Sequence, residues 1–337
     1  MKLPVAAILR STFRLLSTAL LQRRSAAITI AATAAVLALA GCGGVSANTT
    51  PPPPSPSPSP NPTVVPSPTP TPVAPSSVNI PTWHADNGRS GLNSNETQLT
   101  PANVNAGGFG KLFSYAVDGY SYAQPLYISN LRINGSSHNV VFVATEMASV
   151  YAFDADNFGD GSPLWKTSLL QPGDVPQPGG NPKPAQGLTS TPVIDTGSNT
   201  MYLVSAQKSS TGVFSFRLHA LDITTGQEHA GSPVTIHASV SGTNSEAVNG
   251  TITLNNGCLQ RAALLLSRGT LYIGFSACPT GWLLSYDAAS LNQIAVLNMS
   301  PNVDGYGQFG GAGGVWMGLR RLARCQPFCT GGFDPVR

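Results

Sequence analysis

Short runs of alternating apolar and polar residues, separated by turn-forming residues, fill the chain from residue 119 onward. Alternation with a period of two is typical of half-buried β-strands, and the glycine, asparagine and aspartate residues between the runs predict tight turns. The runs fall into three successive units of four. Their ranges are 123–129, 139–145, 149–156 and 162–168; then 190–195, 200–206, 216–226 and 231–236; then 261–267, 270–276, 281–290 and 294–300.

The three units repeat one another, which is the pattern of a repeat architecture. Asp154, Asp222 and Asp287 end the third apolar run of each unit, with spacings of 68 and 65 residues. Each aspartate can cap the turn that follows by accepting backbone N–H bonds. Four short strands per unit predict an antiparallel meander, the blade of a β-propeller. The sequence therefore predicts an all-β propeller with about three four-stranded blades over 119–317. A lead-in strand precedes them, and the ring is incomplete in this chain.

Two further segments give the repeat a family resemblance. The turn Asp222-Ile-Thr-Thr-Gly226 and the run "PLWKTS", which contains Trp165, resemble the repeat of quinoprotein alcohol dehydrogenase-like propellers. "WHADNGRSGLNSNETQLTPANV" (83–104) is similar to the lead-in of such propellers. The resemblance implies that Trp165 is the docking tryptophan that this family often places at that position. It also implies that 78–118 is the seam of the ring, and that 109–119 is a strand that completes the last blade.

The amino end predicts export and a lipid anchor. Residues 1–24 are basic, and 25–42 form an uncharged apolar run that is too short for a membrane span. Its end, Leu39-Ala40-Gly41-Cys42, resembles a bacterial lipobox, which implies a signal peptide at 1–41 and lipidation of Cys42. The alternating prolines of 49–77 favour polyproline II, so we interpret 42–77 as an extended spacer. We expect a protein on the outer membrane or cell surface, held by lipid at Cys42.

Charge excludes one class of function. The net charge of +3 comes from the two ends, because residues 42–317 hold nine cations and fourteen acids. A mildly acidic body without a stripe of Lys and Arg is a poor nucleic-acid binder. We therefore expect no nucleic-acid partner.

Candidate ligand sets are weak. His84, Asp86 and Asn87 could suggest metal binding or acid–base chemistry, but one short loop without a further His or Cys makes a poor zinc site. Residues 154–161 fail the calcium-loop pattern, because Phe158 stands where an acid or amide is needed. The glycine cluster 307–317 lacks the strand, helix and acid of a dinucleotide site. We interpret these segments as structural, and no catalytic residue can be assigned.

The cysteines suggest one covalent link. Cys258 and Cys278 flank the first two strands of the third unit, and an exported protein can keep a disulfide between them. The quinoprotein dehydrogenases that the repeats resemble carry adjacent cysteines at their cofactor, and no Cys-Cys pair occurs here. No cofactor is therefore assigned. Pyrroloquinoline quinone with Ca²⁺ belongs only to the alternative hypothesis of a dehydrogenase.

The carboxyl end changes character. Residues 318–337 contain four arginines and two cysteines, with no strand alternation. A Cys-x₃-Cys pair by itself is a weak metal or redox signal. A shifted reading frame or early termination explains the change better, and we expect further blades in another frame of the gene.

Together these features favour an envelope lipoprotein that presents a β-propeller for binding or assembly, with an envelope protein or a glycan as its partner. The alternatives are an envelope dehydrogenase that oxidises alcohols or sugars with the quinone, and an extracellular glycan-binding module. Function lies in the loops of such a fold, so the strands leave this choice open.

Overall fold

The computed structural model describes residues 78–96, 99–107, 109–179, 185–276, 278, 280–303 and 314–315. Within these ranges the chain forms strands, turns and irregular segments. Within the same ranges, no helix is long and apolar enough to cross a membrane. The predictions for 1–77, Cys42 included, lie outside the described residues. So do those for 318–337 and for most of the glycine cluster.

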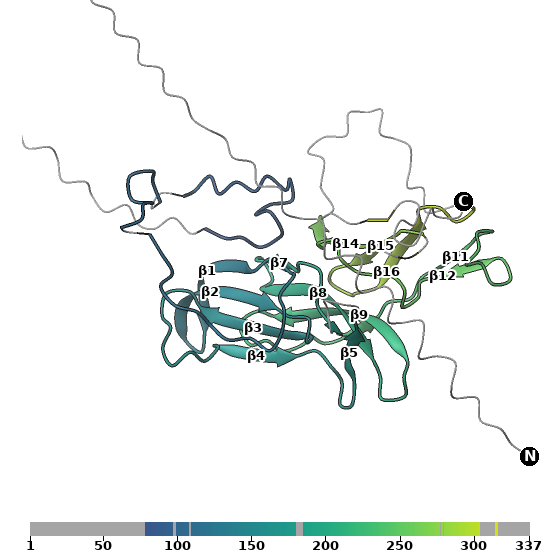
Figure 1. The fold of residues 1–337 in the computed structure, drawn as a ribbon, viewed down its shortest axis with the longest axis horizontal. Helices are drawn as coiled ribbons and strands as arrows, with labels where there is room; N and C mark the ends of the chain where they lie inside the picture. Colours follow the sequence, from purple (N-terminus) through teal and green to yellow (C-terminus); the bar gives the residue numbers. More distant parts are fainter. Residues whose placement is uncertain are drawn as a thin grey trace, which may run out of the picture. The chain divides into compact units, whose positions relative to one another are not determined.

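Three antiparallel meanders confirm the predicted propeller blades, in a ring that is not closed (Figure 1). Blade 1 consists of β1 (Leu126–Ile133), β2 (Ser136–Ala144), β3 (Ser149–Asp154) and β4 (Trp165–Ser168), in chain order. Blade 3 has the same order in β13 (Leu265–Ser267), β14 (Thr270–Phe275), β15 (Trp282–Asp287) and β16 (Gln293–Asn298). Every neighbouring pair of strands in these two sheets is antiparallel.

Blade 2 is larger than predicted. Its meander is β7 (Val193–Asp195), β8 (Thr200–Lys208), β9 (Phe214–Asp222) and β10 (Val234–Thr235). β5 (Val175–Pro178) pairs with the far end of β8, and β6 (Ala185–Gln186) pairs with β5. A separate hairpin, β11 (Ser239–Ser241) with β12 (Thr251–Thr253), stands between blades 2 and 3 in the sequence.

The core lies between successive blades. Alternate side chains of each blade point to its two opposite faces. We call the face that packs on the next blade in the sequence the forward face, and the opposite face the backward face. Blade 1 packs its forward Leu126, Phe142 and Ala152 in one cluster with Met201, Leu203 and Leu221 of blade 2. Blade 2 packs its forward Tyr202, Leu218 and Phe216 in a second cluster with Leu271, Ile273 and Leu284 of blade 3. All residues of β8 except the last are buried, because β8 is covered from both sides.

The lead-in segment contacts the innermost strand of every blade. Ile80 exchanges two backbone hydrogen bonds with Tyr127 on β1, and Pro81 O accepts the N–H of Ile194 on β7. Arg89 Nη2 donates to Leu264 O, directly before β13, at 2.9 Å. The segment therefore joins the three blades along their inner strands. The prediction of a strand at 109–119 is wrong, because this segment pairs with no strand among the described residues.

Candidate functional site

The three repeat aspartates cap turns. Asp154 Oδ1 accepts the N–H groups of Asp156 and Asn157, both at 2.9 Å. Asp222 Oδ1 accepts Thr224 N at 2.7 Å, and Asp287 Oδ1 accepts Ser290 N at 2.8 Å. A carboxylate accepts such bonds best when it is ionised. In Asp287 the bonds from Ser290 are the leading cause of a lowered pKa. These side chains hold the end of the third strand in each blade.

Trp165 contacts the turn of the next blade. Its Nε1 donates to Ile223 O at 2.9 Å, and Thr167 Oγ1 donates to Gly226 O at 2.6 Å. Gly226 has φ +73°, and a Cβ atom built there would lie 2.5 Å from Trp165 Cε3. A side chain at 226 would therefore be strained and would collide with the indole. The D-x-x-T-G turn of blade 2 thus receives the outer strand of blade 1.

The side chains of the lead-in loop make structural contacts in the seam. Asn87 Nδ2 donates to Leu266 O at 2.7 Å, and Asp86 accepts hydrogen bonds from Ser90. The Trp83 and His84 rings stack with centroids 3.7 Å apart, and His84 has a positive φ of 56°. Within the described ranges, no group of three or more His, Cys, Asp or Glu residues could hold a metal ion. The contacts of His84, Asp86 and Asn87 are those of a structural loop.

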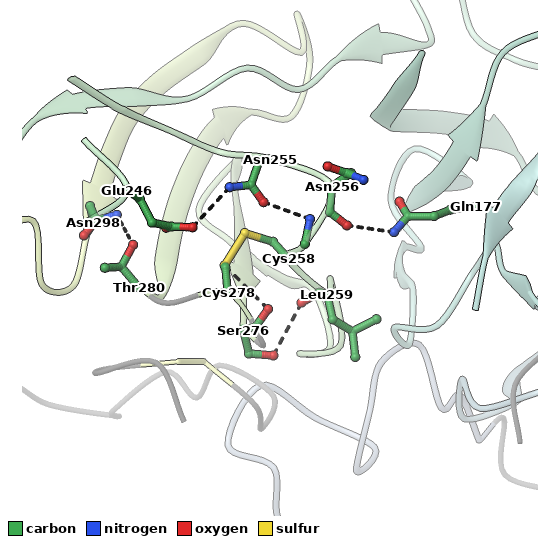
Figure 2. Close-up of a disulfide and its surroundings, with 11 residues drawn as sticks. Gln177, Glu246, Asn255, Asn256, Cys258, Leu259, Ser276, Cys278, Thr280 and Asn298 are labelled. Atoms are coloured by element: carbon green, nitrogen blue, oxygen red, sulfur yellow. Dashed lines mark hydrogen bonds between the residues drawn. A yellow bond between two sulfur atoms is a disulfide. The ribbon is translucent and has the colours of Figure 1, made fainter. Parts of the chain in front are cut away.

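The disulfide joins Cys258 to Cys278, whose Cα atoms are 4.4 Å apart, and both side chains are buried (Figure 2). Beside it, Leu259 and Ser276 form an antiparallel bridge with N–O distances of 2.7 and 3.0 Å. The link therefore ties the loop before blade 3 to the end of β14.

Amide side chains surround this disulfide. Gln177 Nε2 donates to Asn256 O at 2.9 Å, which connects β5 to the same loop (Figure 2). Glu246 accepts a hydrogen bond from Asn255 Nδ2, at 3.4 Å. Burial raises the pKa of Glu246, and the bond from Asn255 opposes this shift. The loop is thus fixed by both a covalent link and hydrogen bonds.

A chain formed by the buried Ser205 and His219 and the partly exposed Glu228 was not foreseen from the sequence. Ser205 Oγ lies 2.8 Å from His219 Nε2, and His219 Nδ1 lies 2.6 Å from Glu228 Oε1. This order is that of a nucleophile, a base and an orienting acid. Both Ser205 and His219 are 0% exposed, and Ser205 Oγ also donates to Gln207 Oε1 at 3.2 Å. We interpret the chain as a buried polar network that satisfies groups on blade 2.

The segment 110–117 lies on the backward face of blade 1. The Tyr115 ring stacks on Phe153 with centroids 4.3 Å apart, and its hydroxyl donates to the carbonyl oxygens of Asp154 and Asn157. A cavity of about 370 Å³ remains beneath the segment. Its lining comprises Phe113, Ser114, Tyr115, Val117, Val141, Val143, Phe153, Asp154 and Ala155. This lining is largely apolar, as in many binding pockets.

Asp118 holds the end of this segment to blade 1. It accepts Thr145 Oγ1 at 2.8 Å and Ser149 Oγ at 2.6 Å, and pairs with Lys166 Nζ at 3.1 Å. Burial raises the pKa of Asp118, but these hydrogen bonds and the charge of Lys166 lower it by more, so the net shift is downward. The ionised carboxylate therefore stabilises the attached segment.

Two features of the described residues bear on a calcium–quinone centre. The disulfide links cysteines 20 residues apart in sequence rather than adjacent ones. The buried Glu146 accepts the N–H of Gly187 at 2.8 Å and the hydroxyl of Thr189 at 2.9 Å. This carboxylate therefore joins the β2–β3 turn of blade 1 to the segment that leads into blade 2.

Comparison with known protein families gives a match at the carboxyl end of the chain. Residues 303–337 match the YidD family, described as putative membrane protein insertion efficiency factor. A relative from Xanthomonas axonopodis pv. citri is 60% identical over 30 residues, which are 9% of this chain and 32% of the relative. One from Rickettsia bellii is 52% identical over 27 residues, 8% of this chain and 37% of the relative. The chain thus spans about a third of the length of these curated relatives.

Solved structures resemble about two thirds of the chain. A quinohemoprotein alcohol dehydrogenase from Pseudomonas putida has a TM-score of 0.45 and 16% identity, and the alignment covers 66% of this chain and 27% of that one. The corresponding enzyme from Comamonas testosteroni has a TM-score of 0.41 and 17% identity, with the same coverage. Likeness at this level carries no information on activity or cofactor.

Proposed function

We propose that this protein is an exported envelope lipoprotein whose β-propeller binds or assembles with another envelope component. The motif Leu39-Ala40-Gly41-Cys42 and the proline spacer that follows support the anchor. Two acyl chains at Cys42 would hold the protein at a membrane, since each buried CH₂ contributes about 0.8 kcal/mol.

The observation that carries the binding role is the backward face of blade 1, which the described residues cover only in part. Phe109, Leu112 and Phe158 are 58, 89 and 40% exposed, and the 370 Å³ cavity has an apolar lining. Apolar surface of this kind marks sites of interaction in soluble domains.

The anchor is tested by Cys42→Ser in the full chain. We expect loss of radiolabelled fatty acid and release of the protein from the membrane pellet into the soluble envelope fraction. Cys325→Ser is the matched control and should keep both label and location. A Cys42→Ser protein that remains membrane-bound and uncleaved would show that 25–41 is itself the anchor.

The binding role is tested against the dehydrogenase hypothesis. Purified full-length protein is mixed with pyrroloquinoline quinone and Ca²⁺, and dye-coupled oxidation of alcohols and sugars is measured. We expect no oxidation above that of the quinone alone. Oxidation of alcohols or sugars that depends on the protein would contradict the binding role and support the dehydrogenase hypothesis.

A second candidate role comes from the carboxyl end. The match of 303–337 to putative membrane protein insertion efficiency factors supports participation in membrane protein insertion. Removing residues 318–337 from the full chain should then lower the insertion of a reporter membrane protein without changing lipidation at Cys42. Unchanged insertion would leave the tail without this role.

A further inference from the structure

A second cavity, of about 100 Å³, lies beside the start of β9. Three segments line it: 214–216 of β9, 235–237 at the end of β10, and the loop 254–256 that follows β12. Backbone hydrogen bonds of 2.9 Å hold them together, because Ile236 N donates to Phe216 O and Leu254 N donates to Ala238 O. The cavity is thus built from strands and a fixed loop, and it shares no lining residue with the cavity on blade 1.

The lining combines an aromatic wall with polar groups. Phe214 is 36% exposed and forms the wall, whereas Phe216 is buried. The polar part of the lining includes hydroxyl, imidazole and amide side chains, those of Ser215, Thr235, His237 and Asn256. Among the described residues, these side chains make no hydrogen bond. Hydroxyl, imidazole and amide groups each offer both a donor and an acceptor. The lining therefore has hydrogen-bonding capacity that the described residues leave unused.

The ligand that matches this lining is neutral and hydroxylated. None of the lining residues that the structure describes is Asp, Glu, Lys or Arg, and Lys208 Nζ lies outside the lining, 5.4 Å from the centroid of the Phe214 ring. The lining therefore lacks a permanent charge with which to recognise an anion or a cation. Groups that both donate and accept suit the hydroxyls of a sugar, and an aromatic ring suits its apolar C–H face. Since drug-sized ligands occupy roughly 300–1,000 Å³, a cavity of about 100 Å³ suits one sugar ring.

The loop that carries Asn256 is held in place without the Asn256 side chain. Gln177 Nε2 donates to Asn256 O at 2.9 Å, and the buried disulfide fixes Cys258 in the same loop (Figure 2). Gln177 is 6% exposed, and its Oε1 is buried without a hydrogen-bond partner among the described residues. Buried acceptors without a partner are uncommon, so this oxygen is a second sign that a polar group is missing beside the loop. The loop is therefore preorganised, and the Asn256 amide remains available to a ligand.

We propose that this cavity binds one ring of a neutral carbohydrate. The Phe214 ring contacts the apolar face of the sugar, and the Asn256 amide and the His237 imidazole form hydrogen bonds with its hydroxyls. Binding of a single sugar is weak, because a cavity of this size offers few contacts. The inference goes beyond the proposed function. It assigns a ligand class to a site other than the backward face of blade 1, and it stands even if that face binds nothing.

The test is saturation-transfer difference NMR on the full-length protein, in a detergent without a sugar headgroup. The probes are glucose, galactose, mannose and N-acetylglucosamine at millimolar concentration. We expect transfer of saturation to the ring protons of at least one sugar, with a response that levels off as its concentration rises. Glycerol is the control probe, because it carries hydroxyls but no ring to lie on Phe214, and it should receive no saturation.

Variants of the protein locate the site. Phe214→Ser removes the aromatic wall and Asn256→Ala removes the amide, and each should weaken sugar binding by about three- to tenfold. Val213→Ser and Thr253→Ala are the matched controls, because both residues are exposed and lie outside the lining. These controls should leave the affinity for the sugar unchanged. Slow amide exchange in β8 shows that each variant is folded.

Several outcomes overturn the proposal. They are no response from any of the sugars, a response no greater than that of glycerol, and unchanged affinity in both Phe214→Ser and Asn256→Ala. Val143→Glu, which places a charge in the cavity of blade 1, serves as a further control. Loss of sugar binding in Val143→Glu alone would place the sugar in that cavity instead. The lipidation and quinone assays report on the proposed function independently, so failure of the two claims can be told apart.

Discussion

At the residue scale, one glycine fixes how two blades meet. Gly226 combines φ +73° with the indole of Trp165 within 2.5 Å of its missing Cβ. Only glycine meets both conditions without strain. The contact of Trp165 with the turn of blade 2 therefore depends on position 226 as much as on the tryptophan.

Gly226→Ala should destabilise the protein more than an alanine at another left-handed glycine. Gly231→Ala is the matched control, because Gly231 has φ +87° and no atom within 4 Å of its Cβ position. Both variants bear the backbone strain of about 1–2 kcal/mol. Gly226→Ala adds overpacking of about 1–3 kcal/mol. Chemical denaturation measures the difference, and equal losses would show that Trp165 can move aside.

Acid should loosen the segment 110–117 through Asp118. The folded pKa of this carboxyl lies below the ordinary value of 3.8, so its contribution is complete above 3.8 and is lost as pH falls through the lowered pKa. The Asp118 amide donates to the Tyr151 hydroxyl, so its hydrogen exchange, corrected for intrinsic rates, should be faster at about pH 3 than at pH 6. Asp118→Asn should speed this exchange at both pH values. Equal exchange of this amide at both pH values in the wild type would contradict this.

Individual residues differ in how far the sequence reveals them. The capping role of Asp154, Asp222 and Asp287 could be predicted because aspartate at a strand end acts locally, on N–H groups two or three residues ahead. The pairing of Ser205 with His219 depends on the register of β8 against β9, which cannot be read from the sequence. Polar residues at inward positions of two neighbouring strands were the available signal.

At the element scale, the long strands follow the predicted runs because successive side chains of a strand point to opposite faces. A half-buried strand therefore alternates with a period of two, and a strand covered on both faces, such as β8, reads as a nearly continuous apolar run. The predicted run 200–206 lies within β8. Shorter elements escaped prediction. β5 reads VPQP and β12 reads TIT, and neither offers enough alternation to distinguish it from a loop. The segment 109–119 shows the opposite error, since its alternation is genuine but pairing needs a partner strand.

The disulfide should stabilise the loop that leads into blade 3. Cys258 and Cys278 are 20 residues apart, and closing a loop of that size contributes about 3 kcal/mol in the chain-entropy account. Cys258→Ser with Cys278→Ser should lower the free energy of unfolding by about that amount. Reductant should act on the wild type and have no further effect on this variant. A variant as stable as the wild type would show that hydrogen bonds alone hold the loop.

At the scale of the whole molecule, the three blades are not equivalent. Blade 2 is covered on both faces by hydrophobic clusters, whereas blade 1 and blade 3 each share one such cluster with it. Stability in a repeat architecture is approximately a sum of unit and neighbour terms. The middle blade therefore has two neighbour terms, and each outer blade has one among the described residues.

Native-state hydrogen exchange should follow this order. β8 and β9 should exchange most slowly, at rates that approach global unfolding, because β8 is buried along almost its whole length. β16, whose Ile294 is 55% exposed, should exchange faster, and 110–117 fastest. A charged substitution on the forward face of blade 2, Leu218→Glu, should release blade 3 and leave β2 and β3 protected. Slowest exchange in β2 and β3, or one rate for all three blades, would mean that the blades unfold as a single cooperative unit.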